Sequence, residues 1–193
     1  MIENENSNNS SLKTFYSNPK INKIKSKLQK EKTTQKLIKI ISDLLSDISS
    51  ENKPNKEENI ILLKSFIMKT IPDISINDFL ERLSKYSKAS DEIFILTLIY
   101  IDRVCHYYSI KLNYNNIHKL ILASFIISNK FLEDSVYSMQ IYAKIGGVSV
   151  KEINHLEYEF LKLIKFNLFV DENLFQLYRE NLSNLESDYN DSE

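Results

Sequence analysis

The sequence predicts an all-helical protein. Only 2 Gly and 3 Pro occur among 193 residues, and sheets with tight hairpins need more turn-forming residues than that. Two segments, from Ile93 to Cys105 and from Ile117 to Phe131, are apolar on every side, which is typical of helices at the centre of a bundle. Other segments carry apolar residues at the spacing of amphipathic helices. Together these patterns predict a compact bundle around a central buried helix.

The first part of the chain is predicted to precede this bundle. Residues 1–18 are rich in Asn and Ser and are expected to be disordered. Residues 19–70 are expected to form a basic segment and N-terminal helices that pack on the bundle. The basic segment, from Lys20 to Lys39, carries 8 Lys and 1 Glu. A solvated helix or tail is favoured over a phosphate-binding arm, because Arg and interleaved aromatic residues are absent. An amphipathic helix then ends before Pro54, with its apolar face at Leu37, Ile40, Ile41, Leu44, Leu45 and Ile48.

Residues 71–185 are predicted to form the bundle itself. Ser75 is expected to cap its first helix, and Ser90 precedes the second. Ser149 and Glu152 match a capping box, in which each side chain satisfies an open backbone N–H group of the other residue. The first helix is expected to bury Ile76, Phe79, Leu80 and Leu83, and the helix after Ser149 to bury Ile153, Leu156, Phe160 and Ile164.

The end of the chain and the two glycines complete the predicted layout. Gly146 and Gly147 have no phosphate-loop spacing and are expected to stop a helix with a positive φ. A last helix is predicted to begin at Asp171. Residues 186–193 are expected to form a frayed acidic tail.

Charge and cysteine content exclude several classes of function. The formal net charge of -1 gives no reason to expect a nucleic-acid or membrane partner for the whole chain. No apolar run approaches the ~18 residues of a spanning helix, and the N-terminus has no signal-peptide pattern. A single cysteine, Cys105, excludes an internal disulfide and fits a reducing compartment. We therefore expect an intracellular protein of the cytoplasm and/or nucleus.

Catalytic motifs are missing from the sequence. His106, His118 and His155 fall in different segments without a second ligand at metal-binding spacing, and Cys105 lies in an apolar run, where a thiol behaves as a small hydrophobe. No nucleophile, oxyanion donor or cofactor loop accompanies the paired acids of the chain. The sequence thus favours a protein that binds another protein over an enzyme, with no metal or cofactor.

Two charged residues stand out because they border apolar stripes. Lys130 comes at the end of an apolar helix directly before Phe131, and Glu157 directly follows Leu156 on another helix. A charge in such a place is costly unless it is paired. Either Lys130 and Glu157 only pair with each other, or both reach the surface on one face and hydrogen-bond the exposed backbone of a partner.

At these residues the sequence resembles a cyclin box, and within the cyclins it is similar to the P/U type, the Pho80-like group. The resemblance spans about residues 37–182. The segments that carry it occur in the same order and at fitting spacings; they are residues 74–76, 79–83, 85–86, 99–103, 116–121, 129–134, 142–148, 152–154, 156–161 and 166–168.

The resemblance implies a single cyclin-box bundle of five helices and a non-catalytic regulatory role. Such a protein binds a cyclin-dependent-type kinase and holds the kinase's mobile helix inward, so that the Lys–Glu ion pair needed for phosphoryl transfer forms. The family's two interface charges fall on Lys130 and Glu157, with apolar contacts at Phe131, Leu161, Phe166 and Leu168. Glu133 and Asp134 are expected to meet kinase arginines and partly replace a phosphate on the activation loop.

The sequence also departs from other cyclins. The docking patch that mitotic-type cyclins carry in their first helix is replaced here by residues 76–80, so substrate docking through that groove is not expected. We expect a monomer when the protein is alone. Two alternatives remain open. One is a nucleic-acid-binding or transcription adaptor with a cyclin-like fold, for which the Lys20–Lys39 segment would supply a basic arm. The other is a scaffold that binds a kinase without activating it.

Overall fold

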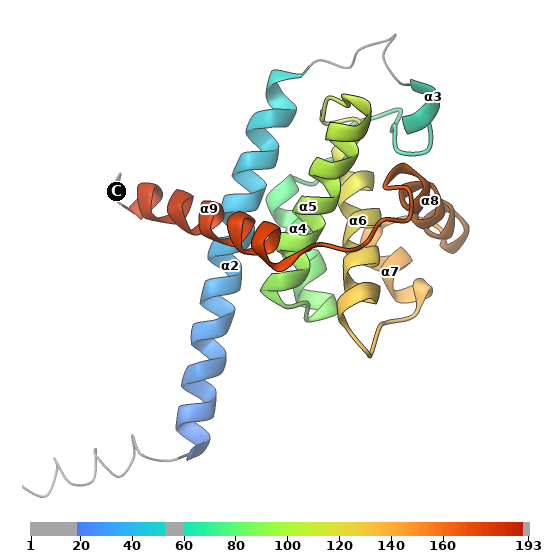
Figure 1. Cartoon of the computed structure of the whole chain (residues 1–193). Coiled ribbons are helices and arrows are strands. Elements are labelled where there is room, and N and C mark those ends of the chain that lie inside the picture. Colours follow the sequence, from blue (N-terminus) through green and yellow to red (C-terminus); the bar gives the residue numbers. More distant parts are fainter. Residues whose placement is uncertain (1–18, 53–59, 191–193) are drawn as a thin grey trace, which may run out of the picture. The chain divides into compact units, whose positions relative to one another are not determined.

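The computed structural model describes residues 19–52 and 60–190, and the regular secondary structure in these ranges is helical (Figure 1). The chain divides into two compact units, residues 1–36 and residues 37–193. In the first unit, the described residues belong to the N-terminal part of helix α2 (Pro19–Glu51). The basic segment from Lys20 to Lys39 is therefore helical. The disorder predicted for residues 1–18 lies outside the described residues.

The second unit contains the remainder of α2 and a bundle of short helices. α4 to α8 are the five helices of the predicted bundle, so the all-helical fold class is confirmed. The helices are α3 (Ile60–Leu63), α4 (Ile76–Ser87), α5 (Asp91–Tyr108), α6 (Ile117–Leu132), α7 (Met139–Gly146), α8 (Val150–Leu163) and α9 (Glu172–Asn190).

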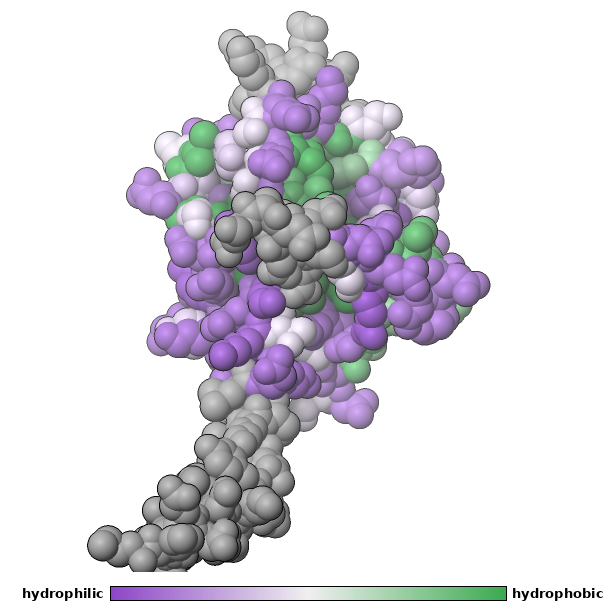
Figure 2. Space-filling view, turned by 90° about the vertical axis from the view of Figure 1, so that its left-hand side faces the viewer, coloured by the Kyte–Doolittle hydropathy of each residue, from purple (hydrophilic) through white to green (hydrophobic). Residues whose placement is uncertain are grey.

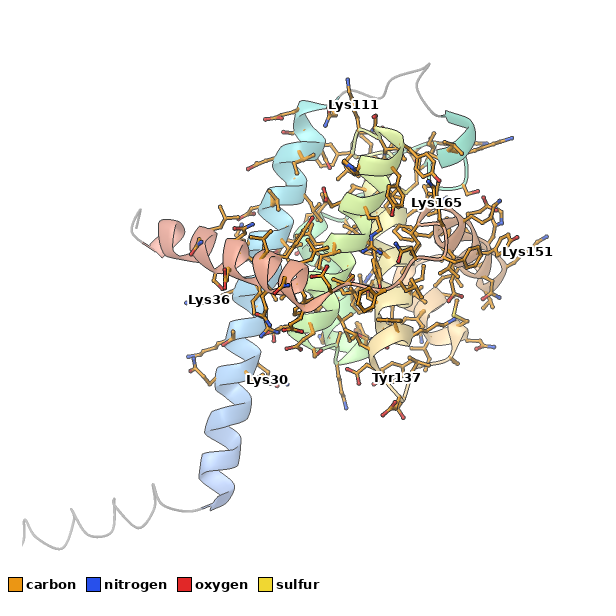
Figure 3. All side chains as sticks on the ribbon, viewed as in Figure 1. Lys30, Lys36, Lys111, Tyr137, Lys151 and Lys165 are labelled. Atoms are coloured by element: carbon orange, nitrogen blue, oxygen red, sulfur yellow. The ribbon has the colours of Figure 1, made fainter. Side chains whose placement is uncertain are left out.

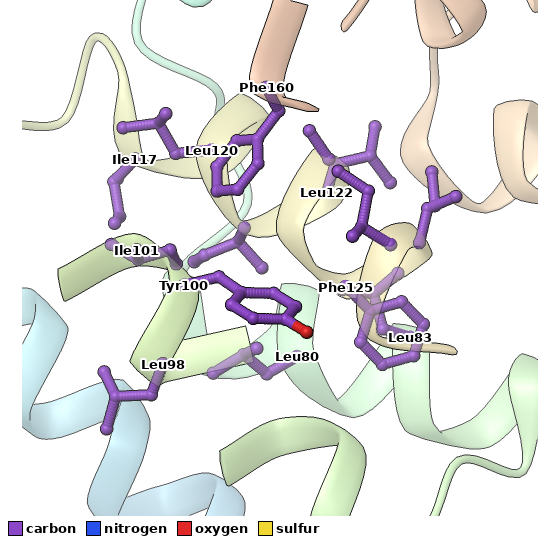
Figure 4. Packing of buried hydrophobic residues seen from close by; sticks show 14 of the residues in the cluster. Leu80, Leu83, Leu98, Tyr100, Ile101, Ile117, Leu120, Leu122, Phe125 and Phe160 are labelled. Atoms are coloured by element: carbon purple, nitrogen blue, oxygen red, sulfur yellow. The ribbon is translucent and has the colours of Figure 1, made fainter. Parts of the chain in front are cut away.

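Helix α6 occupies the centre of the bundle. It packs against α5 on one side and α8 on another, and apart from Lys119 its residues from Ile117 to Asn129 are buried. The apolar side chains of α4, α5, α6 and α8 meet around it (Figure 4). Phe94 of α5 and Phe125 of α6, with ring centroids 5.4 Å apart, show how closely the two central helices approach. The two segments that are apolar on every side are thus the central pair, as predicted.

The part of α2 within the second unit packs on this bundle. Ile38, Ile41 and Leu45 are buried there. Ser42 Oγ donates a hydrogen bond to Asn77 Oδ1 of α4 at 3.2 Å. Near the C-terminal end of the chain, α9 packs against α5. It continues to Asn190, through the region expected to form an acidic tail. Residues 191–193 lie outside the described residues, and the domain boundaries given above stay a prediction.

The helix starts follow the capping residues closely. Ser75 Oγ accepts a hydrogen bond from the Asp78 N–H group at 3.0 Å, and Ser149 Oγ accepts one from the Glu152 N–H group at 3.1 Å. The second half of the predicted capping box differs, because the Glu152 carboxylate forms an ion pair with Lys119 of α6 at 2.8 Å. Glu152 thus links two helices instead of closing only its own first turn.

The two glycines have different roles, and only one matches the prediction. Gly147 ends α7 with φ 68, the left-handed conformation that glycine adopts without strain. Gly146 is still helical, and a Cβ atom there would lie 2.5 Å from Cδ2 of Leu122. Glycine at 146 therefore lets α7 approach α6 closely.

We expect Gly146→Ala to lower the free energy of unfolding by about 1–3 kcal/mol, because the buried Leu122 side chain has to move to make room. Urea unfolding followed by circular dichroism measures this change. Gly147→Ala serves as a comparison, since a Cβ there meets nothing within 4 Å and only backbone strain remains. An unchanged urea midpoint for Gly146→Ala would contradict the close approach of the two helices.

One face of the protein carries both hydrophilic and hydrophobic side chains. The face in Figure 2 is mostly hydrophilic, and its hydrophobic atoms form separate patches between polar side chains. Scattered patches of this kind are ordinary on protein surfaces and do not by themselves indicate a binding site.

Candidate functional site

Lys130 and Glu157 form an ion pair at the surface between α6 and α8. Lys130 lies in the last turn of α6, and its Nζ atom is 2.6 Å from Glu157 Oε1 in the middle of α8. The side chain of Lys130 is 36% exposed and that of Glu157 17%. The structure therefore brings the two charges together on one face, and both side chains remain accessible to solvent.

The backbone beneath this pair is held by buried groups. Leu156 and Phe160, on either side of Glu157 along α8, are fully buried. Asn129, directly before Lys130, is also buried, and its Oδ1 atom accepts a hydrogen bond from the Tyr142 hydroxyl of α7 at 2.8 Å. Burial raises the pKa of Tyr142 to about 12, so this hydroxyl keeps its proton at neutral pH. α6, α7 and α8 thus fix the position from which Lys130 leaves the bundle.

The four apolar residues predicted for this site lie at or near the surface. Phe131 and Phe166 are exposed, whereas Leu161 and Leu168 are partly buried against the core. Leu161 is one turn after Glu157 on α8, and its carbonyl accepts a hydrogen bond from the Phe166 N–H group at 2.8 Å. The chain after α8 therefore folds back next to Leu161.

Glu133 and Asp134 are exposed where α6 ends. The Glu133 N–H group donates to the Asn129 carbonyl at 2.9 Å, which closes the last turn of the helix. Glu133 also borders a surface cavity of about 310 Å³, together with Lys88, directly after α4, and residues of the segment before α7. One of these residues is Tyr137, which Figure 3 labels. The acids thus lie a few residues from Lys130, and Glu133 faces a space that a partner side chain could enter.

Comparison with known proteins decides the family. The sequence profile described as Cyclin matches residues 7–168, which is most of the chain. This chain belongs to the cyclin family. Within that family it is of the P/U type, since the relatives it matches include proteins named as PHO85 cyclins and as U-type cyclins.

Three relatives illustrate the extent of the similarity. The chain is 36% identical to the PHO85 cyclin-like protein psl1 of Schizosaccharomyces pombe over 158 residues, 75% of this chain and 65% of that protein. It is 34% identical to PHO85 cyclin-7 of Saccharomyces cerevisiae, over 75% of this chain and 59% of that protein. It is 34% identical to Cyclin-U4-1 of Arabidopsis thaliana, over 78% and 76% of the two chains. The chain therefore spans less than two thirds of the two fungal relatives.

Burial shifts the pKa of one histidine of this cyclin and of its cysteine. His118 Nε2 lies 3.0 Å from the Ile74 carbonyl, which requires a proton on that nitrogen, and burial lowers the pKa of this histidine. Burial raises the pKa of the Cys105 thiol to about 12, so that it stays protonated and unreactive. In the described ranges, no group of three or more His, Cys, Asp and Glu side chains could hold a metal ion, and no helix is long and apolar enough to cross a bilayer.

Sequence reasoning missed a group of residues next to the site. Phe169 is 73% exposed, the largest exposure among the large apolar side chains of the described residues. Tyr100 and Arg103 of α5 contact the backbone of the segment that carries it. The apolar residues of this segment do not recur at helical or strand spacing. Its only sequence signal is that Phe166 and Phe169 lie close together in a connection between helices.

Proposed function

We propose that this cyclin is a regulatory, non-catalytic subunit that binds and activates a Pho85-type cyclin-dependent kinase. The observation that carries the proposal is the Lys130–Glu157 pair at the surface. The exposed Phe131 directly follows Lys130, and the exposed Phe166 bonds through its backbone N–H group to Leu161, one turn after Glu157. The names of the two fungal relatives, PHO85 cyclin-like protein psl1 and PHO85 cyclin-7, support the choice of kinase class. A partner of this kind places the protein in the cytoplasm and/or nucleus.

The geometry suits recognition of a kinase helix and its backbone. Within the described residues, Lys130 Nζ donates to Glu157 Oε1 alone, so its other N–H groups can reach carbonyl groups of a partner. Glu157 keeps Oε2 for a partner's N–H donors. Charge-assisted hydrogen bonds of this type are short and directional. They would set the orientation of the kinase helix, while Phe131, Leu161, Phe166 and Leu168 supply the apolar contact area.

Activation then follows from position rather than from chemistry in this chain. Holding the kinase's mobile helix inward brings its glutamate to the catalytic lysine, which completes the ion pair that orients the nucleotide phosphates. The cyclin itself contributes no reacting group to this step.

The test is to mix the purified chain with a Pho85-type kinase of Saccharomyces cerevisiae. We propose that the chain is a monomer before the kinase is added. We expect a one-to-one complex on gel filtration and faster phosphorylation of a peptide than with the kinase alone. Complex formation without faster phosphorylation would identify a scaffold. Binding to DNA or RNA that weakens steeply with salt, without kinase binding, would identify a nucleic-acid adaptor.

Glu133 and Asp134 are proposed to contact arginines of the kinase activation loop. Their exposure at the end of α6, with Glu133 beside a cavity, supports this role. We expect the double variant Glu133→Gln/Asp134→Asn to bind the kinase within about 3-fold of the wild-type affinity but to activate it about 10-fold less, because the carboxylates stand in for a phosphate.

Peptide phosphorylation at saturating cyclin measures this effect. Glu180→Gln, which neutralises an exposed acid of α9, is the matched control and should activate normally. Full activation by the double variant would eliminate the proposed arginine contacts.

A further inference from the structure

The segment that follows α8, residues 165–169, has an unusual backbone. We call it the α8–α9 strap. Lys165 and Phe166 both have φ 54, in the left-handed region that side chains other than glycine rarely adopt. Two such residues in succession persist only where surrounding contacts fix them.

The Lys165 and Phe166 N–H groups donate to the Lys162 and Leu161 carbonyls, which closes the end of α8. One face of α5 holds the carbonyl groups that follow. The Tyr100 hydroxyl donates to the Leu168 carbonyl at 2.7 Å. The Arg103 guanidinium donates to the Asn167 carbonyl and, at 3.1 Å, to the Phe169 carbonyl. Three successive carbonyl groups of the strap thus accept hydrogen bonds from two α5 side chains. Tyr100 and Arg103 lie one turn apart, which places them on the same side of the helix.

A further α5 residue contacts the start of the strap. The Lys165 ammonium group lies 4.9 Å from the centroid of the Tyr107 ring, one turn beyond Arg103 on the same face. Figure 3 shows Lys165 where α8 ends. The strap is therefore fixed along its length by α5, in addition to the partly buried Leu168.

The result of this arrangement is a pair of exposed phenylalanines. Phe166 is 60% exposed and Phe169 is 73% exposed. A connection that served only to reach α9 would be expected to bury such side chains or to lack them, because an exposed phenylalanine gains nothing from the hydrophobic effect. A rigid backbone that presents them loses little conformational freedom when a partner covers them.

We propose that Tyr100 and Arg103 are positioning residues that fix the strap so that Phe166 and Phe169 form a preformed apolar docking surface for the kinase. This inference rests on the proposed function. The surface is continuous with the Lys130–Glu157 site, because the Phe166 N–H group bonds to the carbonyl of Leu161, one turn after Glu157. The occupant is therefore the same kinase, through an apolar patch beside the helix that the ion pair contacts.

The test measures both the strap and the binding. In the free protein, amide hydrogen exchange at Phe166 and Asn167 should be about 10-fold faster in Arg103→Ala and Tyr100→Phe than in the wild type, because the strap opens more often. Affinity for the Pho85-type kinase of Saccharomyces cerevisiae should fall about 10-fold in each variant. Tyr100→Phe keeps the buried ring and removes only the hydroxyl donor, so it provides a folded variant if Arg103→Ala does not fold.

A double-mutant cycle separates positioning from general stabilisation. Phe169→Ala alone should also weaken kinase binding about 10-fold, and adding it to Arg103→Ala should weaken binding little further, since the displaced phenylalanine no longer contacts the kinase. Arg179→Ala is the matched control, because Arg179 also links α9 to α5, through Glu92 at 2.9 Å, but touches no strap carbonyl. It should leave the affinity unchanged.

The outcomes distinguish this inference from the proposed function. If the wild-type chain does not bind the kinase, the proposed function fails and the docking surface fails with it. If the wild type binds but Arg103→Ala and Tyr100→Phe bind equally well, or if the effects of Arg103→Ala and Phe169→Ala simply add, only the positioning role is overturned.

Discussion

Replacing Glu157 by alanine is expected to abolish most of the kinase affinity while leaving the fold almost unchanged. The affinity should fall by about 2–4 kcal/mol, roughly 30- to 1000-fold in Kd, because the change removes one charge of a pair that the kinase would cover and leaves Lys130 without its counter-ion in the interface. The free energy of unfolding should change by about 1 kcal/mol or less, since the ion pair is partly exposed in the free chain. Titration calorimetry and urea unfolding measure the two quantities. Lys130→Ala should behave in the same way.

The chain contains a matched control for this prediction. Lys119 and Glu152 also join α6 to α8, at 2.8 Å, but near the start of both helices. Glu152→Ala should cost a similar amount of stability, or slightly more because Glu152 lies in the first turn of α8, and should leave kinase affinity unchanged. Two results would show that the Lys130–Glu157 pair only links the two helices. One is unfolding of the chain by Glu157→Ala, and the other is wild-type kinase affinity in both Glu157→Ala and Lys130→Ala.

The largest loss of stability is expected from Phe160→Ala. The Phe160 ring is fully buried and meets the ring of Phe66 edge-on, with centroids 6.1 Å apart. Truncation removes apolar contacts and leaves a cavity between α8 and the segment after α3, which should cost about 3–5 kcal/mol. This is a large share of the ~5–15 kcal/mol that stabilises a typical domain. Urea unfolding should show a much lower midpoint.

Two further variants of α8 show whether the loss of stability comes from removing a buried ring. Phe160→Leu keeps most of the volume and should lose less than half as much stability as Phe160→Ala. Tyr158→Ala removes an exposed ring from the same helix and should change the free energy of unfolding by about 0.5 kcal/mol or less. Equal losses for Tyr158→Ala and Phe160→Ala would mean that burial of Phe160 does not stabilise α8 as described.

Much of the fold could be predicted from the sequence because local signals and burial agree. The apolar residues expected to face inward from α8, Ile153, Leu156, Phe160 and Ile164, are all fully buried. Ser75 and Ser149 begin their helices as expected, because a hydroxyl at that position satisfies an open backbone donor. Such patterns depend on neighbouring residues only, so sequence alone contains them.

Features that depend on packing between helices could not be predicted. The role of Gly146 follows from the approach of α7 to Leu122, which no local pattern records. The strap is a stronger example. Nothing in residues 165–169 indicates how their backbone is held, and the α5 side chains that bond to its Asn167, Leu168 and Phe169 carbonyls lie more than 60 positions earlier in the chain. Only the tertiary structure brings these groups together.

The candidate site lies between these two cases. The sequence singled out Lys130 and Glu157 because each charge borders an apolar stripe, and the resemblance to cyclins gave them a role. Their separation of 2.6 Å and their shared exposure follow from how α6 packs on α8. The structure therefore accommodates both interpretations of the pair, as a link between helices and as a binding site, and experiment separates them.

Hydrogen exchange of the complex tests the central claim most directly. The full chain would be measured alone and with a saturating amount of the Pho85-type kinase. We expect slower exchange in the last turn of α6, in α8 from Glu157 onward and in residues 165–169, with little change in α4 or in residues 37–51 of α2. Slower exchange confined to α4 or α2, with α6, α8 and the strap unchanged, would show that the kinase binds elsewhere and that the Lys130–Glu157 face is not its site.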